Sequence, residues 1–321
     1  MDQVLLPDTL ELARAYPEWA SLGAGVGRYV SFGEYPEDDA EEPVLYLPSG
    51  RVTAPEIAVV EAMNPEAIVE TVAHSWYTDS SGPLKLRHPA EGETLPEYAG
   101  PAIPFESLEG ADRYSWLKAA RYDGLPAEVG PLARLLVAWG QGQKEAATAL
   151  GMAMSTLSLR PEGLTSTMGR LVAKGVEAQM LAGHVSDWLD DLRENLETGD
   201  LAVADLRRWD PGSWPSPAEG WSLGEGPRGS VGHWTRIEDR QVRHYQVVDA
   251  STWNVSPRDA TGTPGPMETA LAGTPVIDPA RPLEILRTIH SFDPCAACAV
   301  HALGRRGGGA GARAAVWETP R

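Results

Sequence analysis

The sequence has very few cysteines and no long apolar run. Only two of its 321 residues are cysteine, so a framework of structural disulfides is not expected. No apolar segment reaches the roughly 20 residues that a membrane-spanning helix needs, since Arg134 interrupts the run at 131–140. The acidic, amphipathic N-terminal stretch lacks the basic start and apolar core of a signal peptide. Taken alone, these absences predict a soluble chain.

Positive charge is also scarce. The chain has 27 Lys and Arg against 45 Asp and Glu, which gives a formal net charge of −18. Nucleic acids and anionic lipid surfaces both require a basic protein surface, so neither is expected as a partner. With 42% apolar residues, the chain can bury a sizeable core. Its length allows one large domain or two ordinary ones.

Both cysteines lie in one short motif near the end of the chain. Cys295 and Cys298 are three residues apart, and His301 follows three residues later. Asp293 can cap a helix that starts at Pro294, which would place Cys295 in its first turn and favour the thiolate. Two thiolates on one side of a helix can grip a soft metal, but they supply only half of a four-coordinate site. Spacing alone leaves a redox pair, a zinc half-site and a disulfide open.

Periodicity and turn signals predict a mixture of helices and short strands. Arg240 lies at an expected hairpin tip, and His184 is expected in a packed position rather than as a metal ligand. An irregular segment rich in Pro, Gly and aromatic residues is expected at 77–126, and the Gly/Arg/Ala extension at 302–321 is expected to be disordered. Helices are expected at 10–19, 65–76, 131–140, 166–197 (capped by Ser166 or Thr167) and 282–289, and strands at 26–32, 45–47, 51–52, 220–223, 230–237 and 242–248.

The residues around the cysteines resemble the C-terminal signature of the large subunit of nickel–iron hydrogenases. The resemblance is carried by residues 287–301, with the ending D-P-C-x-x-C-x-x-H. Further segments are similar to the same family and extend the resemblance from about Gly25 to His301; they are 74–77, 91–94 with Pro96 and Tyr98, 114–119, 121–124, 128–134, 225–229, 251–254 and 256–259.

The sequence departs from the family pattern at a few places. The family usually has Pro where Ala120 stands, and an apolar residue and Pro where Asp249 and Ala250 stand. The resemblance covers only the second half of the family's large subunit. The matching N-terminal motif of the family, R-x-C-G-x-C-x-x-x-H, is absent. The resemblance therefore implies a C-terminal portion: a fragment, a truncated reading frame or one half of a split subunit.

The resemblance implies a nickel–iron centre whose iron carries carbon monoxide and cyanide. Four cysteines hold the nickel in the family, and by position Cys295 would be a terminal ligand and Cys298 a bridging one. His301 resembles a ligand of a nearby Mg²⁺ or Fe²⁺ ion, and the carbonyl of Val247 would approach the same ion. Thiolates suit this chemistry because they are soft and strongly donating.

The resemblance also assigns residues around the open metal position. Arg228 would act there as a charged base or hydride-stabilising group, paired with Asp293. Pro227 would shape the cavity, and Ser251 would donate a hydrogen bond to an iron-bound cyanide. An ordinary buried ion pair is the alternative interpretation of Arg228 and Asp293.

The implied partners are H₂, an iron–sulfur small subunit that receives the electrons, the missing N-terminal half, and a maturation peptidase. The peptidase would remove residues 302–321 after nickel insertion, so that 1–301 would form a single unit. Such large subunits are often exported alongside a partner that carries the signal, which leaves a cytoplasmic, membrane-associated or periplasmic location open.

The sequence therefore predicts an α+β, mainly helical fold with long helices, a small antiparallel β element and a C-terminal helical metal-ligand segment. The leading hypothesis for function is the catalytic large subunit of a nickel–iron hydrogenase, with the isolated chain inactive. Two alternatives belong to other classes: a non-catalytic remnant that folds or binds a partner, and a C-x-x-C thiol–disulfide protein, which lacks the expected βαβ context. Metal analysis distinguishes the three.

Overall fold

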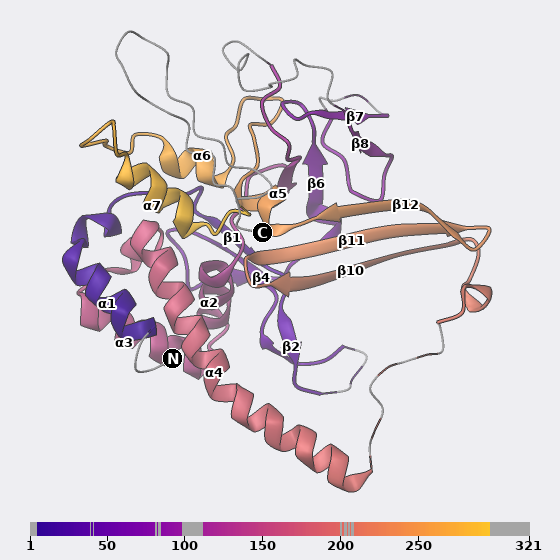
Figure 1. Ribbon diagram of the computed structural model, residues 1–321, viewed down its shortest axis with the longest axis horizontal. Coiled ribbons are helices and arrows are strands. Elements are labelled where there is room, and N and C mark those ends of the chain that lie inside the picture. The colour runs from indigo at the N-terminus through magenta and orange to yellow at the C-terminus, as the bar shows by residue number, and fades with distance from the viewer. Residues whose placement is uncertain are drawn as a thin grey trace, which may run out of the picture.

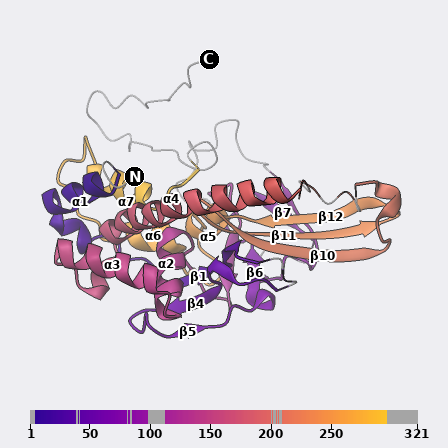
Figure 2. The same cartoon turned by 90° about the horizontal axis from the view of Figure 1, so that it is seen from below.

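The computed structural model of the chain describes residues 5–38, 40, 42–80, 82, 85–97, 112–199, 201, 204, 206 and 209–295. Helices gather at one end of the molecule, and a long three-stranded sheet extends at the other (Figures 1 and 2). The α-helices are α1 (Leu5–Ala15), α2 (Pro131–Gly140), α3 (Lys144–Leu157), α4 (Thr167–Thr198), α5 (Ala250–Asn254), α6 (Pro266–Leu271) and α7 (Leu283–Ser291). Single 3₁₀ turns include Pro17–Ala20, Pro65–Ala67, Pro161–Leu164 and Pro211–Ser213.

The strands form small antiparallel sheets. The largest orders β10 (Ala218–Gly226), β11 (Gly229–Glu238) and β12 (Gln241–Val248) as two consecutive hairpins. A second sheet orders β1 (Arg28–Ser31), β4 (Gly50–Thr53) and β5 (Val60–Glu61). Three pairs complete the set: β2 (Glu34–Pro36) with β3 (Leu45–Leu47), β6 (Ile68–Thr71) with β9 (Ala119–Tyr122), and β7 (Tyr77–Asp79) with β8 (Thr94–Pro96).

Two apolar clusters form the core, and strand β1 contributes to both. Tyr29 packs in the cluster built mainly from α2, α3 and α4, whereas its neighbour Val30 packs in the cluster that contains Trp234 and Trp253. Successive side chains of a strand point to opposite faces, so one strand can serve two cores. The helical body and the β10–β12 sheet are joined through this strand.

The ends of α4 follow the chemistry of its terminal residues. Ser166 precedes the helix in an extended conformation, and its hydroxyl accepts a hydrogen bond from the amide of Gly169 at 3.0 Å. Gly199 ends the helix in the left-handed conformation, which glycine adopts without steric cost. The predicted cap at Ser166 is therefore confirmed. His184 is packed as expected, with Nε2 3.0 Å from Glu145 and its ring against Tyr46.

Several predictions are confirmed, and others are not. The mixed α+β class, the hairpins of the large sheet and the helices near 131–140 and 282–289 agree with the structure. The expected predominance of helix is not confirmed, because many short antiparallel strands are present. Helix α3 was not predicted. The segment at 77–126, expected to be irregular, contains β7, β8 and β9 among its described residues.

The helix predicted at 65–76 is wrong. A single 3₁₀ turn is followed by strand β6, whose residues pair with β9 from Ile68↔Tyr122 to Thr71↔Ala119. The apolar spacing of four between Ile68 and Val72 fits a strand as well as a helix, because four is a multiple of the strand period. The β-branched residues of this stretch then favour the strand.

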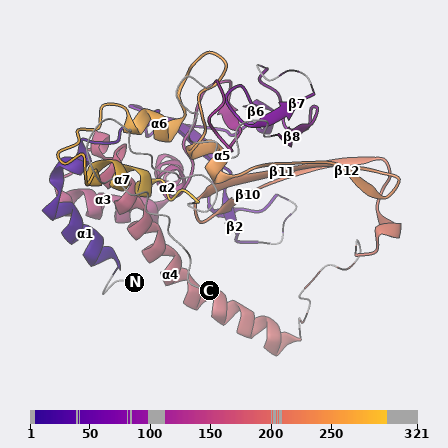
Figure 3. The ribbon, with the colours of Figure 1, turned by 45° about the horizontal axis from the view of Figure 1, so that its top comes forward.

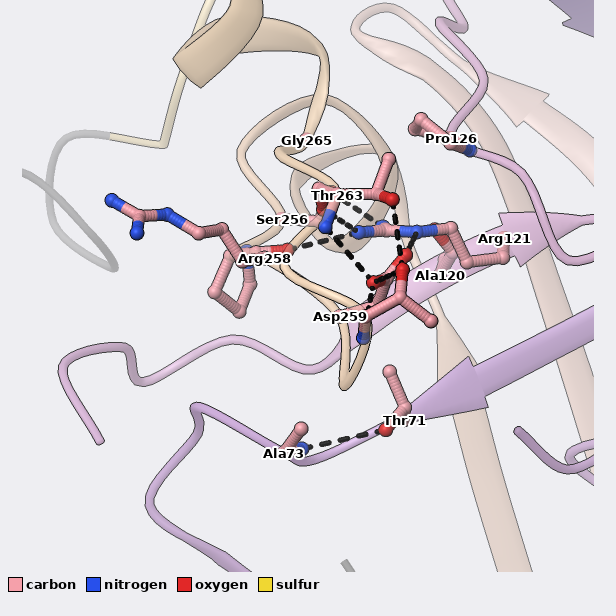
Figure 4. A network of polar contacts seen from close by, with 12 residues as sticks. Thr71, Ala73, Ala120, Arg121, Pro126, Ser256, Arg258, Asp259, Thr263 and Gly265 are labelled. Carbon is pink, nitrogen blue, oxygen red and sulfur yellow. Dashed lines mark hydrogen bonds and ion pairs between the residues drawn. The ribbon is translucent and has the colours of Figure 1, made fainter. Parts of the chain in front are cut away.

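A buried arginine fixes the loop that follows α5 against β9. Arg121 is fully buried, and its Nε donates to Asp259 Oδ2 at 3.1 Å (Figure 4). Nη1 donates to Ala120 O and Ser256 Oγ. Nη2 donates to Pro257 O and Thr263 O. All the donors of a buried guanidinium are thus paired, as burial of this charge requires.

The long helix α4 leaves the body halfway along its length. Its first half is packed in the core, and its second half projects from the body at an angle to the β10–β12 sheet (Figures 1 and 3). In the part of the chain that the structure describes, no helix is both long and apolar enough to cross a membrane.

Candidate metal centre

Arg228 is held at the tip of the first hairpin of the large sheet. Pro227 and Arg228 form the two-residue turn between β10 and β11, and Gly226 and Gly229 pair across its base. Gly229 has φ of +138°, and an added Cβ would collide with the Val129 side chain. The turn therefore packs against Val129 and Gly130, the residues that precede α2. This contact fixes the position of the Arg228 backbone.

The Gly130 backbone makes the same contact from the other side. Its φ is +115°, and an added Cβ would lie 2.8 Å from the carbonyl oxygen of Arg228. Pro131 then occupies the first turn of α2, where its missing amide costs no hydrogen bond. The close approach of two backbone segments explains why glycine stands at both positions.

Asp293 is part of the C-terminal end of helix α7, in addition to its predicted place before a following helix. It adopts φ of +49° just after α7, and its amide donates to His290 O at 3.1 Å. Aspartate is among the few residues that tolerate this left-handed conformation. The start of a helix at Pro294 falls largely on residues outside the described part, so that prediction remains a prediction.

The partner of the Asp293 carboxylate is Lys174 on α4. Lys174 Nζ lies 2.7 Å from Asp293 Oδ2 and donates to His290 O at 3.1 Å. Burial lowers the pKa of Lys174, although Asp293 acts to raise it. Among the described residues Asp293 forms its ion pair with Lys174, and Arg228 only shares the same recess. The expected Arg228–Asp293 pair is therefore not formed here.

Arg170, one turn before Lys174 on α4, supports the chain just ahead of Asp293. Its guanidinium carbon lies 3.8 Å from the centre of the Phe292 ring, a cation–π arrangement. The same guanidinium donates to both carboxylate oxygens of Glu128, at 2.6 and 2.9 Å, and to Gly23 O. A bidentate pair of this kind fixes orientation as well as charge. Helix α4 thus holds Phe292 and Asp293 with two successive basic side chains.

Ser251 reaches the same recess from the short helix α5. Asp249 caps this helix by accepting hydrogen bonds from the amide and hydroxyl of Thr252 at 2.8 and 2.7 Å. Asn254, at the end of α5, exchanges two hydrogen bonds with the backbone of Val129, at 3.0 and 2.9 Å. Although Asp249 departs from the family pattern, it supplies a normal helix cap. Ser251 is consequently buried and lines the recess.

Two adjoining recesses bring three of the predicted site residues together, namely Arg228, Asp293 and Ser251. Arg228, Asp293 and Asn254 line both, while Lys174 lines one and Ser251 the other. Pro294 closes the second recess, and the half-buried Cys295 follows it in the chain. Val247 lies on β12, paired with His233. Cys298 and His301 lie outside the described residues, as does the extension at 302–321.

A second charge cluster fixes the base of the hairpin, and sequence reasoning did not identify it. Arg134 on α2 forms ion pairs with Glu177 at 2.6 Å and with Glu225 at 2.7 Å, and donates to the carbonyls of Gly226 and Pro227. Burial raises the pKa of Glu225 even though Arg134 opposes the shift. The sequence signal for this cluster was a charged residue at a position expected to be buried, as at Arg134 within the apolar run 131–140.

The one thiol among the described residues, that of Cys295, fits a soft metal. Cys295 supplies a thiol beside a recess that carries both an arginine and a carboxylate. Within the described residues, no group of three or more His, Cys, Asp or Glu side chains could hold a metal ion.

Comparisons with known proteins give one consistent result. The sequence pattern of the family described as nickel-dependent hydrogenase matches residues 1–301. The hydrogenase-1 large chain of Escherichia coli K12 is 38% identical over 319 residues, which cover 96% of this chain and 53% of that protein. The uptake hydrogenase large subunit of Bradyrhizobium diazoefficiens is also 38% identical, with 94% and 52% covered. The chain spans about half the length of these relatives.

Solved structures agree in fold. The [NiFeSe]-hydrogenase of Desulfomicrobium baculatum superposes with a TM-score of 0.73 at 31% sequence identity, covering 92% of this chain and 56% of that one. The G50T variant of the [NiFeSe] hydrogenase from Desulfovibrio vulgaris Hildenborough gives 0.74 at 29% identity, with 94% and 57% covered.

Proposed function

Because this chain belongs to the nickel-dependent hydrogenase family, we propose that it forms part of a catalytic large subunit that cleaves H₂ into two protons and two electrons. The observation that carries the proposal is the recess where Arg228, Asp293 and Ser251 meet beside Cys295. These residues come from three separate parts of the chain, and the fold brings them together at the motif that resembles the family's metal ligands.

Cys295 and Cys298 would supply two of the four thiolates of a nickel–iron centre whose iron carries carbon monoxide and cyanide. The centre would provide the Lewis acid and accept the electrons of the reaction. His301 and the carbonyl of Val247 would hold a Mg²⁺ or Fe²⁺ ion nearby. Ser251 would donate a hydrogen bond to a cyanide ligand, and its place on the lining of the recess supports this role.

A side chain of this recess would accept a proton released when H₂ is cleaved. Arg228 lines the recess from the tight turn that it forms with Pro227, and Pro227 would shape the cavity. A base near the metal must lie close to the point where H₂ is split and away from bulk water. We assign this role to Nη of Arg228 in its neutral guanidine form, which would take up the proton and become guanidinium, with Asp293 as its acidic neighbour. Lys174 would hold the Asp293 carboxylate in place.

The whole enzyme would need further components. An iron–sulfur small subunit would take the two electrons, and a polypeptide equivalent to the missing N-terminal half would supply the other thiolates. A maturation peptidase would remove residues 302–321 after the metal is inserted. This chain has only two cysteines, so it would be inactive alone.

Replacement of Arg228 tests the proposed base in the assembled enzyme. We expect Arg228→Lys to lower the rate of H₂ oxidation by about 100-fold or more, since lysine cannot place the same planar donors over the metal. Nickel and iron content, measured by metal analysis, should stay unchanged. Arg236→Lys on β11 is the matched control. Normal activity in Arg228→Lys, with full metal content, would remove Arg228 from the mechanism.

A further inference from the structure

The projecting half of α4 carries an apolar stripe that its own fold leaves open to solvent. Val185, Leu189, Leu192 and Leu196 recur at i, i+4, i+7 and i+11, so they share one face of the helix. They are exposed by 47%, 59%, 53% and 54%. We call these four residues the α4 stripe. A regular stripe of four large aliphatic side chains on one helix is typical of a packing face.

The opposite and flanking faces of this half-helix are strongly acidic. Asp190, Asp191 and Glu194 lie between the stripe positions, Glu197 follows the last of them, and all four are exposed. The helix is therefore amphipathic in its second half, with a charged side suited to water and an apolar side that is not. Trp188 borders the stripe and stacks on Tyr35 with ring centres 5.3 Å apart, which fixes the helix relative to β2.

The neighbouring sheet also exposes large side chains far from the core. Trp221 on β10 and Tyr245 on β12 are each 54% exposed. The sheet and the second half of α4 project from the same side of the body (Figures 1 and 3). Two projecting elements with uncovered apolar side chains indicate that a partner packs against this side of the protein.

We propose that the α4 stripe is the docking face for the part of a hydrogenase large subunit that lies outside this chain's match. Nearly half of the E. coli relative is not covered by the alignment, so the family fold includes a polypeptide of the required size. The inference rests on the proposed function, because the same polypeptide would bring the thiolates that the metal centre lacks. The segment that binds should present an apolar helix face rimmed by Lys or Arg, which would complement the acidic flanks.

The test uses the full chain with one defined partner polypeptide. The probe is the portion of the E. coli hydrogenase-1 large chain that this chain does not match, purified separately and titrated by isothermal calorimetry. Leu189→Asp and Leu192→Asp should each weaken binding at least about tenfold, since each places a charge in a desolvated face. Thr198→Asp is the matched control, because it introduces the same charge on the opposite face of the same helix.

Three outcomes are informative. Binding that is lost in Leu189→Asp and Leu192→Asp but retained in Thr198→Asp supports the docking face. Equal binding by all variants, each with an unchanged circular dichroism spectrum, overturns it. A concentration-dependent dimer of the chain alone that Leu189→Asp dissociates also overturns it, in favour of a second copy. Metal content of the mixed complex is measured separately: docking without nickel would count against the proposed function and leave the docking face intact.

Discussion

At the scale of single residues, the site depends on which charges are paired. The family resemblance predicted an ion pair between Arg228 and Asp293, but in the structure the Asp293 carboxylate forms its ion pair with Lys174. Lys174 lies more than 100 positions away along the chain, within a helix whose pattern indicated only core packing. No local sequence signal could identify this pairing, because it is created by the contact between α4 and the end of α7.

The contribution of Lys174 can be measured directly. We expect Lys174→Met to lower H₂ oxidation by the assembled enzyme about tenfold or more, because Asp293 loses the group that holds its carboxylate. The free energy of unfolding should change by about 1 kcal/mol or less, since Asp293 is partly exposed. Lys174→Arg keeps the ion pair and serves as the control. If Lys174→Met retains the activity of the control at full nickel content, the positioning role is wrong.

The Arg121–Asp259 pair predicts a pH dependence of stability. Burial alone would raise the pKa of Asp259, but hydrogen bonds from Thr261, Arg121 and Thr263 outweigh it and lower the pKa. The unfolded chain therefore binds this proton more readily than the folded one. Stability is present above the unfolded pKa of about 3.9 and is lost as the pH falls through the lower folded pKa.

Urea unfolding between pH 2.5 and 6 checks this expectation. The wild-type chain should lose stability more steeply below about pH 4 than Asp259→Asn, which has no proton to bind at this site. Asp259→Asn should also be less stable at pH 6 by about 3 kcal/mol, since it leaves the buried Arg121 charge without its partner. Parallel pH curves for the two proteins would contradict the assigned shift.

At the scale of elements, local chemistry predicted some structures well and failed at others. Ser166 capped α4 as expected, and the turn at Arg240 closed a hairpin, because caps and tight turns depend on a few adjacent residues. Strand β6 was mistaken for a helix, since its identity depends on pairing with β9, about 50 residues later. The recess was predicted through family resemblance, whereas its supporting contacts from Arg134, Arg170 and Asn254 required the folded structure.

The hairpin that carries Arg228 should be sensitive to one added methyl group. We expect Gly229→Ala to lower the free energy of unfolding by about 2–4 kcal/mol, because the new Cβ meets the Val129 side chain and the backbone has a positive φ. Gly142→Ala is the control, since φ there is +82° but nothing lies within 4 Å of the new Cβ. Equal losses in the two variants, measured by urea unfolding, would show that backbone strain alone is responsible.

At the scale of the whole molecule, covalent processing reports on metal insertion. The protein purified from its native cells should have the intact mass of a chain that ends at His301, because removal of 302–321 would follow nickel insertion. Mass spectrometry measures this directly, and growth without nickel provides the control, in which the extension should be retained. The full mass of 321 residues after growth with nickel would count against a working metal centre in this chain.

Helix α4 carries both Lys174, which pairs with Asp293, and the α4 stripe. Lys174 and Leu192 are separated by about 27 Å along a continuous helix, at 1.5 Å per residue. The first half of this helix is packed in the core, so a partner on the stripe would be held about five helical turns from the amine that faces Asp293. The docking face and one of the groups around the proposed site would therefore belong to a single continuous element.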